Sequence, residues 1–412
     1  MLFAKMGVPN DQLAFFTTLL YFPWFLKGLW SPFVDVLRTK RWWIVMMQAL
    51  MTALCILLTI TLPHPAAETI AAKETSVGLF QWTLVFFIIT AFASATHDIA
   101  ADGYYMLAHN TKSQAAFVGI RSTFYRIAAV FSQGVLVYAA GYIENKTGNI
   151  PLSWQVTLGI TSVILLFVTI YHCFALPRVE SEEPKVERQE AKAVWKELGQ
   201  AFATFFTKPG VGLAIAFMLM YRLSEGFLVK LSQPFLVDAK EAFIRDGQVI
   251  GGGLALSTDT VGLLYGTIGV IFLLLGGILG GIYISRRGLK RSIWLMAAAL
   301  TLPSFVYCYL SMAQPDSLWL IGIAVSFEQF GYGFGFTAYM LYMMHFSDGP
   351  YKTAHYAICT AFMALSMMIP GFVAGSLEMA VGYTKFFWIA NACSVTTFVI
   401  TYFVWKELKV ES

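Results

Sequence analysis

The chain contains eleven apolar runs, each long enough to cross a lipid bilayer as a helix. A spanning helix needs about 20 largely apolar residues, because a bilayer core offers backbone N–H and C=O groups no partner and a helix satisfies its own. With 58% hydrophobic and 13% charged residues, the 412-residue chain is too apolar for a water-soluble domain. We therefore expect an all-α polytopic membrane protein, with spans near residues 11–30, 42–63, 79–107, 115–141, 152–175, 209–233, 258–284, 292–312, 317–344, 354–377 and 383–404.

The basic residues predict how these spans are oriented. Lys and Arg concentrate in alternate loops, which the positive-inside rule assigns to the cytoplasm. These loops include the charged segment 178–208 and the C-terminus. The opposite loops carry only Lys5, Lys73, Lys146, Lys240, Arg245 and Lys385. The same rule places Met1 outside.

Two short basic segments, 250 residues apart, indicate that the chain is built twice. SPFVDVLRTKR at 31–41 and GIYISRRGLKR at 281–291 each follow an apolar run. We expect an N-terminal bundle of five spans over 1–177, a cytoplasmic linker over 178–208 and a C-terminal bundle of six spans over 209–412. The later part of the linker has apolar residues at the spacing of an amphipathic helix, at Val194, Leu198, Phe202 and Phe205.

The two halves differ by one run before their basic segments, so the first helix of a twelve-helix parent is expected to be missing. The alternative is a true eleven-helix protein with an exported N-terminus. Overlapping Gly-x-x-x-Gly steps at Gly276, Gly277, Gly280 and Gly281 predict close helix packing in lipid. A glycine-rich segment at 238–259 is expected to be an external connector, or alternatively a lid.

Charged residues inside apolar runs are the main candidates for function. On insertion scales, a charged side chain near the bilayer centre costs about 2.5–3.5 kcal/mol. Such residues therefore face a water-filled cavity or one another. Asp98 and Asp102 lie four apart on one helical face, and Arg121 and Arg126 open the next run. The second half supplies Arg222, Glu225, Lys230 and Glu328.

Glu328 stands alone in its run and is the best candidate for a carboxylate that gains and loses a proton. The alternative is that these charges pair and stabilise the bundle. In the two basic loops we expect a cytoplasmic gate, formed by Asp35, Arg38, Lys40, Arg41, Arg286, Arg287 and Arg291.

Several motifs together resemble the major facilitator superfamily. The segment at 281–291 fits its loop signature, Gly-x3-Asp-Arg-x-Gly-x-Arg/Lys-Arg/Lys, with Ser285 in the place of the aspartate. Lys27-Gly-Leu-Trp-Ser-Pro followed by Asp35, Asp98-Ile-Ala-Ala-Asp-Gly, Tyr125-Arg-Ile and Arg222-Leu-Ser-Glu resemble motifs of one branch, the AmpG-type muropeptide permeases and related acetyl-coenzyme A transporters.

The resemblance implies proton-driven uptake of an anionic, sugar-containing solute, such as a muropeptide, across a bacterial inner membrane. Proton coupling is then expected at Asp98, Asp102, Glu225 and Glu328, and substrate binding at Arg121, Tyr125, Arg126, Arg222 and Lys230. Alternatives are transport of an oligosaccharide or acyl-coenzyme A, drug efflux, and a non-transporting sensor on the same fold.

The sequence argues against other classes of protein. The six histidines are scattered without ligand spacing, and there is no Gly-x-Ser-x-Gly elbow, so we expect no enzyme, metal or cofactor. All five cysteines lie inside apolar runs and are interpreted as packing residues. The expected partners are a small-molecule substrate, protons and the bilayer, with no nucleic acid, and the protein is expected to be a monomer.

Overall fold

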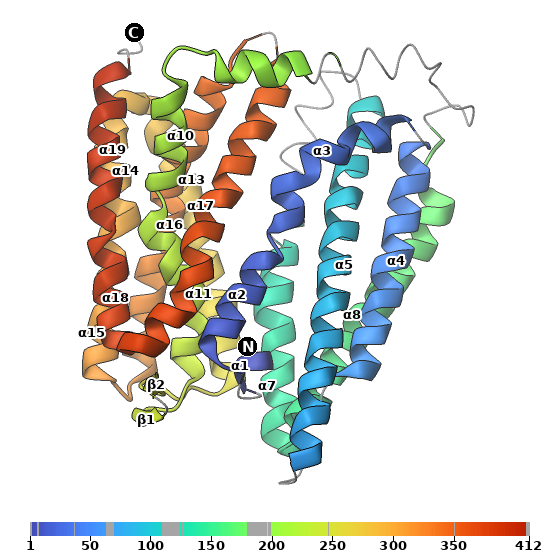
Figure 1. Cartoon of the computed structure of the whole chain (residues 1–412), viewed down its shortest axis with the longest axis vertical. Helices are drawn as coiled ribbons and strands as arrows, with labels where there is room; N and C mark the ends of the chain where they lie inside the picture. The colour runs from blue at the N-terminus through green and yellow to red at the C-terminus, as the bar shows by residue number, and fades with distance from the viewer. Residues whose placement is uncertain are drawn as a thin grey trace. The chain divides into compact units, whose positions relative to one another are not determined.

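The computed structural model describes residues 2–5, 8–36, 38–62, 70–108, 124–125, 127–178, 196, 199–245, 247–349 and 351–408. Within these residues the chain is helical apart from turns and one two-stranded sheet (Figure 1). Nine helical segments there are long and apolar enough to cross a membrane: Lys40–Thr61, Gln81–Tyr104, Ile127–Thr147, Ile150–Ala175, Val211–Val237, Thr258–Arg287, Leu289–Ala313, Ala354–Val381 and Tyr383–Glu407. Each overlaps a predicted run, and Ile127–Thr147 extends six residues beyond the run predicted at 115–141.

The other two predicted runs are helical as well. The run at 317–344 is one continuous helix, α16 (Leu318–Phe346). Glu328 and Gln329 lower its mean hydropathy, and it is not one of the nine segments above. The run at 11–30 was predicted as one helix and is instead divided into α2 (Asn10–Leu19) and α3 (Phe22–Val36) by a turn at Leu20 and Tyr21. Pro23 explains the break, since its ring nitrogen carries no hydrogen to donate to the preceding turn.

Contacts between helices group the described chain into two compact units, considered separately below. Unit 1 comprises residues 1–18, 128–141 and 201–412, and unit 2 comprises residues 19–127 and 142–200. The bundle limits expected from the sequence, 1–177 and 209–412, remain a prediction.

Unit 2 is built on α4, which packs against both α5 and α8, while α3 packs against α5. Its helices are α3, α4 (Lys40–Thr61), α5 (Ile70–Ala108), α8 (Ile150–Ala175) and the end of α7 (Leu136–Thr147). Large apolar side chains such as Phe167 and Phe174 point outward, 71% and 85% exposed. This surface suits a lipid environment, where an exposed apolar side chain carries no hydration cost.

Unit 1 contains the remaining elements. They are α1 (Leu2–Lys5), α2, η1 (Phe131–Val135), α10 (Val211–Met220), α11 (Leu223–Val237), β1 (Phe243–Arg245), β2 (Gln248–Ile250), α12 (Thr258–Val261), η2 (Gly262–Gly269), α13 (Val270–Arg287), α14 (Leu289–Thr301), η3 (Leu302–Ser304), α15 (Phe305–Ala313), α16, α17 (Lys352–Val381), α18 (Tyr383–Ala392) and α19 (Ser394–Glu407).

Helix α16 organises unit 1 because it packs against α13, α14 and η2. The predicted close approach at the paired glycines is confirmed for two of them. A Cβ at Gly276 would lie 2.1 Å from the carbonyl oxygen of Phe330, and one at Gly280 would lie 2.7 Å from that of Phe334. The backbones of α13 and α16 therefore meet where any side chain would hold them apart. Gly281 has no such neighbour.

A second backbone contact joins two π-helical segments, η1 and η2. A Cβ at Gly266 would lie 1.7 Å from the carbonyl oxygen of Gln133, and one at Gly134 would lie 2.2 Å from Thr267 Oγ1. Neither position tolerates a side chain without movement of the backbone.

The glycine-rich segment at 238–259, described except for residue 246, contains the two strands of the sheet. Strands β1 and β2 pair antiparallel as a short hairpin, with Phe243 opposite Ile250. Gly251 has a φ of +83°, and a Cβ there would lie 2.1 Å from the carbonyl oxygen of Glu241.

All five cysteines are free thiols, but Cys173 is exposed, so its interpretation as a packing residue is wrong.

Candidate functional site

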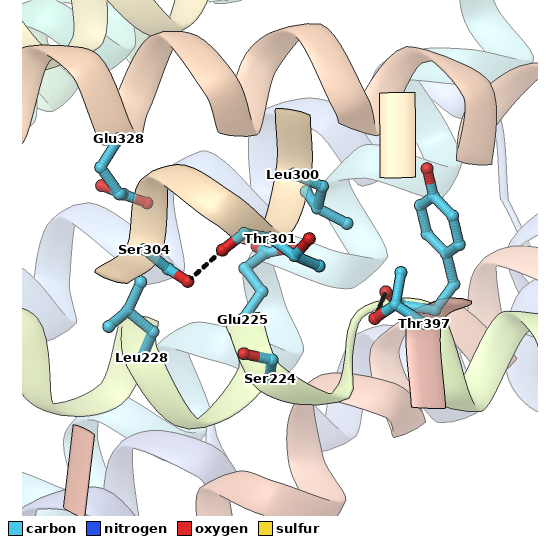
Figure 2. A pocket seen from close by; sticks show the side chains of 9 residues that line it. Ser224, Glu225, Leu228, Leu300, Thr301, Ser304, Glu328 and Thr397 are labelled. Atoms are coloured by element: carbon cyan, nitrogen blue, oxygen red, sulfur yellow. Dashed lines mark hydrogen bonds between the residues drawn. The ribbon is translucent and has the colours of Figure 1, made fainter. Parts of the chain in front are cut away.

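A polar pocket inside unit 1 brings together two of the predicted carboxylates. Its lining residues come from α10–α11, α14–η3, α16 and α19, and are Tyr221, Ser224, Glu225, Leu228, Leu300, Thr301, Ser304, Glu328 and Thr397. Figure 2 shows Glu328 entering from α16 and Glu225 from α11, with Thr301 and Ser304 on the segment that joins α14 to α15. The sequence did not predict these hydroxyl groups as neighbours.

The local backbone explains why polar groups are found here. Helix α10 ends at Met220 and α11 begins at Leu223, so the run predicted as one span contains a turn at Tyr221 and Arg222. Pro303 likewise interrupts the helix between α14 and α15 with a 3₁₀ turn. Interrupted helices free backbone groups, which polar side chains then satisfy: Thr397 Oγ1 donates to the carbonyl of Tyr221 at 2.9 Å, and Ser304 Oγ donates to that of Thr301 at 2.5 Å.

Glu225 forms a two-point ion pair with Arg222. The Nε and Nη2 atoms of the guanidinium each donate to one carboxylate oxygen at 2.7 Å, and both residues are nearly buried, 4% and 5% exposed. Arg222 Nη2 also donates to the hydroxyl of Tyr332 at 2.9 Å, and the guanidinium lies 4.5 Å from the centre of the Phe336 ring. Both members were predicted site residues, but the sequence did not predict that they pair with each other.

Glu328 has a different environment. It is 5% exposed, and its Oε2 accepts a hydrogen bond from Gln329 Nε2 at 2.9 Å. Across the described ranges no ion pair involves Glu328, whereas Glu225 holds its own cation. A buried carboxylate without a counter-charge is far more stable when protonated. The pocket therefore combines an ion-paired carboxylate with one suited to carry a proton.

The pocket is too small for a sugar. The space open to the centre of a water molecule is about 10 Å³, which is room for about one water. The pocket therefore leaves no space for an organic solute in this conformation.

Of the other predicted substrate-binding residues, Lys230 is described in the same unit and does not line this pocket. Lys230 is partly buried on α11, where its Cε atom would lie 2.8 Å from a Cβ at Gly371. Tyr125 is 75% exposed. Arg121 and Arg126 lie outside the described residues.

In unit 2, Asp98 pairs with a cation that the sequence analysis did not assign to it. Lys27 Nζ lies 3.2 Å from Asp98 Oδ2, with the two side chains 28% and 35% exposed. Asp102, one turn further along α5, is partly buried. The expected pairing of these aspartates with Arg121 or Arg126 falls outside the described residues.

The residues predicted to form a cytoplasmic gate have varied surroundings. Lys40 is 5% exposed, and Arg41 Nη2 donates to the carbonyl of Cys173 at 2.5 Å. Arg287 donates to the hydroxyl of Tyr283 at 3.1 Å. Arg38, Arg286 and Arg291 are exposed, and the side chain of Asp35 lies outside the described part of the structure.

A second polar cluster, which sequence reasoning missed, lies in unit 1 where α2 meets α11, α17 and α18. Asn10 Nδ2 lies 2.8 Å from the hydroxyl of Tyr383, 3.0 Å from Glu378 Oε2 and 3.3 Å from Asp238 Oδ2. Tyr383 in turn donates to Asp238 Oδ2 at 2.7 Å. The signal available in the sequence was the position of these four residues. Each lies at the end of a predicted run, and the antiparallel order of the runs brings these ends to one side of the membrane.

Neither cluster resembles a metal site. Among the described residues, no group of three or more His, Cys, Asp or Glu side chains is arranged to hold a metal ion.

Comparison with known proteins agrees with the fold and the motifs. The family model described as Acetyl-coenzyme A transporter 1 matches residues 6–204. The anhydromuropeptide permease of Escherichia coli K12 is 22% identical over 405 residues, covering 96% of this chain and 74% of the relative. Putative transporter AmpG 4 of Rickettsia conorii is 24% identical over 372 residues, covering 88% and 80%, and an uncharacterized protein of Haemophilus influenzae is 24% identical over 412 residues, covering 95% and 85%.

Solved transporter structures show the same fold. The D-xylose-proton symporter superposes with a TM-score of 0.68 at 15% identity, covering 97% of this chain and 88% of that one. The nucleoside transporter NupG gives 0.59 at 13% identity, covering 97% and 92%. The chain is thus an integral membrane protein with the fold of major facilitator transporters, and the relatives and structural neighbours that it matches are transporters and permeases, not enzymes. Its sequence is similar to AmpG-type permeases over most of its length and to the acetyl-coenzyme A transporter family over residues 6–204.

Proposed function

We propose that this transporter takes up an anionic, sugar-containing solute of the muropeptide class across a bacterial inner membrane, driven by protons. The solute class rests on the motifs shared with AmpG-type permeases and on the relative named an anhydromuropeptide permease. The membrane, and a cytoplasmic location of the linker and C-terminus, rest on the positive-inside distribution and on the bacterial relatives. Transport follows by alternating access of the two bundles.

The observation that carries proton coupling is the buried pocket shared by Glu225 and Glu328. Glu328 is the carboxylate that binds the proton, and Glu225 is kept ionised by Arg222. A proton passed from Glu328 to Glu225 neutralises the carboxylate that holds Arg222. The guanidinium is then available to an anionic solute, so that binding of proton and solute favours the same conformation.

The test is uptake into proteoliposomes under an inward proton gradient, with labelled anhydromuropeptide as the solute. We expect accumulation that an uncoupler abolishes. Glu328→Gln removes the titratable group with little change of shape, and we expect it to abolish accumulation while exchange of solute down its gradient continues.

Glu241→Gln is the matched control, because Glu241 is an exposed carboxylate of the same unit. Accumulation by Glu328→Gln at the rate of the Glu241→Gln control would remove Glu328 from the coupling mechanism. Accumulation that resists the uncoupler in the unmodified protein would remove proton coupling altogether.

A further inference from the structure

The cluster of Asn10, Asp238, Glu378 and Tyr383 contacts α2, a helix that a turn separates from the rest of its predicted run. Helix α2 groups with unit 1, whereas α3, which continues the same predicted span, groups with unit 2. A turn at Leu20 and Tyr21 separates the two helices. Helix α2 therefore belongs to unit 1 only through its side-chain and backbone contacts there.

Those contacts are of two kinds. Along α17, Gly371 and Gly375 form a Gly-x-x-x-Gly step against which α2 packs: a Cβ at Gly371 would lie 2.2 Å from Thr18 Oγ1, and one at Gly375 would lie 2.1 Å from the carbonyl oxygen of Asn10 and 2.5 Å from Asp11 Cα. At the start of α2, Asn10 reaches into the polar cluster. The contact at the two glycines involves no carboxyl group, whereas the cluster contains two.

The hydrogen atoms of the cluster do not suffice for its contacts when both carboxyl groups are ionised. Asn10 Nδ2 carries two hydrogens, yet three oxygen atoms lie within 3.3 Å of it. The hydroxyl hydrogen of Tyr383 is used by Asp238. One added proton on the Asp238–Glu378 pair neutralises one carboxylate, which removes the repulsion between two carboxylates that accept from one nitrogen atom.

The surroundings favour such a proton. Glu378 is 1% exposed, and burial raises the pKa of Asp238 despite the hydrogen bonds from Tyr383 and Asn10, which lower it. The other charged groups near this end are otherwise engaged or exposed: Lys240 pairs with Asp316, while Glu241 and Lys385 are exposed and Asp11 is partly exposed on α2.

We propose that Asn10, Asp238, Glu378 and Tyr383 form a proton-dependent latch that docks α2 onto α11, α17 and α18. With one proton on the carboxyl pair, the two groups do not repel each other as like charges, and α2 stays docked. When the pair loses its proton, the two buried carboxylates repel each other and gain hydration by release of α2, which swings about the turn at Leu20 and Tyr21. The sequence places this end of unit 1 outside, where the proton concentration drives uptake.

The sign of the pH dependence follows from which state holds the proton more tightly. The docked state raises the carboxyl pKa, so docking is strongest below the ordinary carboxyl range and weakens as pH rises toward the raised value. Each unit of pKa difference between the docked and released states changes the equilibrium constant for docking about tenfold. The latch does not require that transport be proton-coupled, because docking is measured without any solute.

The experiment measures the distance between spin labels at Gln12 and Lys385, both exposed, in full-length protein with its five cysteines replaced by alanine. Between about pH 5 and about pH 8 we expect a longer distance to appear, and the ratio of docked to released protein to fall about tenfold for each pH unit by which docking raises the carboxyl pKa. Glu378→Gln and Asp238→Asn each keep the short distance at both pH values. Gly375→Leu forces α2 away and gives the long distance at both, while Glu241→Gln behaves as the unmodified protein.

Two results would overturn the latch. One is a short distance at both pH values in the parent protein while Gly375→Leu shows the long one, since the assay then detects release and pH does not cause it. The other is a full parental pH response in both Glu378→Gln and Asp238→Asn. Uptake by the same variants, measured separately, tells whether a failure concerns the latch or the transport proposal.

Discussion

The buried pair of Arg222 and Glu225 allows a quantitative test of how this protein holds charge inside its bundle. We consider replacing Arg222 with Met, Glu225 with Leu, and both together. Each single replacement leaves the other charge buried, at 4% or 5% exposure, with its partner removed. Breaking a buried pair in this way costs about 3–5 kcal/mol. The double replacement leaves no charge and is expected to cost less than the sum of the two single replacements.

The two hydrogen bonds of 2.7 Å between the side chains set the expected coupling. We expect an interaction energy of about 2–3 kcal/mol in the double-mutant cycle, near the upper end for residues in direct contact. The assay is reversible unfolding in mixed micelles, followed by helical circular dichroism. Tyr332→Phe is the control, because it removes only the hydroxyl that Arg222 contacts and should cost about 1 kcal/mol. Single and double losses that add to within about 0.5 kcal/mol would refute the reasoning.

Two further predictions use thermal unfolding. Gly266→Val places a side chain where a Cβ alone would lie 1.7 Å from the Gln133 carbonyl, so we expect a loss of at least about 1–3 kcal/mol and a lower Tm, and an unchanged Tm would show that η1 and η2 do not touch. Lys27→Ala breaks an ion pair in which both side chains are about a third exposed, so we expect the free energy of unfolding to change by only about 0–1 kcal/mol. A much larger loss would contradict the interpretation of this pair as a solvent-screened one.

Much of the site could be listed from the sequence but not assembled. Glu225, Arg222 and Glu328 were all identified because charges are rare in apolar runs, yet which of them pair depends on how α10, α11 and α16 pack. The sequence separation between Glu225 and Glu328 carries no information on their distance. The hydroxyl groups of Thr301 and Ser304 drew no attention, since such residues are common in membrane helices and become informative only beside a buried carboxylate.

The latch cluster illustrates the same limit from another side. Asn10, Asp238 and Glu378 lie at run ends, where polar residues are ordinary and signal nothing by themselves. Their convergence required α2 to pack against α17 at Gly371 and Gly375, and that contact in turn required the break at Leu20 and Tyr21. A pattern of apolar residues predicts a helix and does not reveal where a helix will divide.

The sequence alone predicted that the chain crosses a membrane and where most of its helices lie, because the bilayer imposes length and apolarity on each span separately. Its local motifs indicated a resemblance to the major facilitator superfamily. Only the tertiary structure decided which charges share a pocket, which glycines bring backbones together and where the first predicted run divides. Those properties arise from distances between segments hundreds of residues apart, and distances of that kind are set by packing.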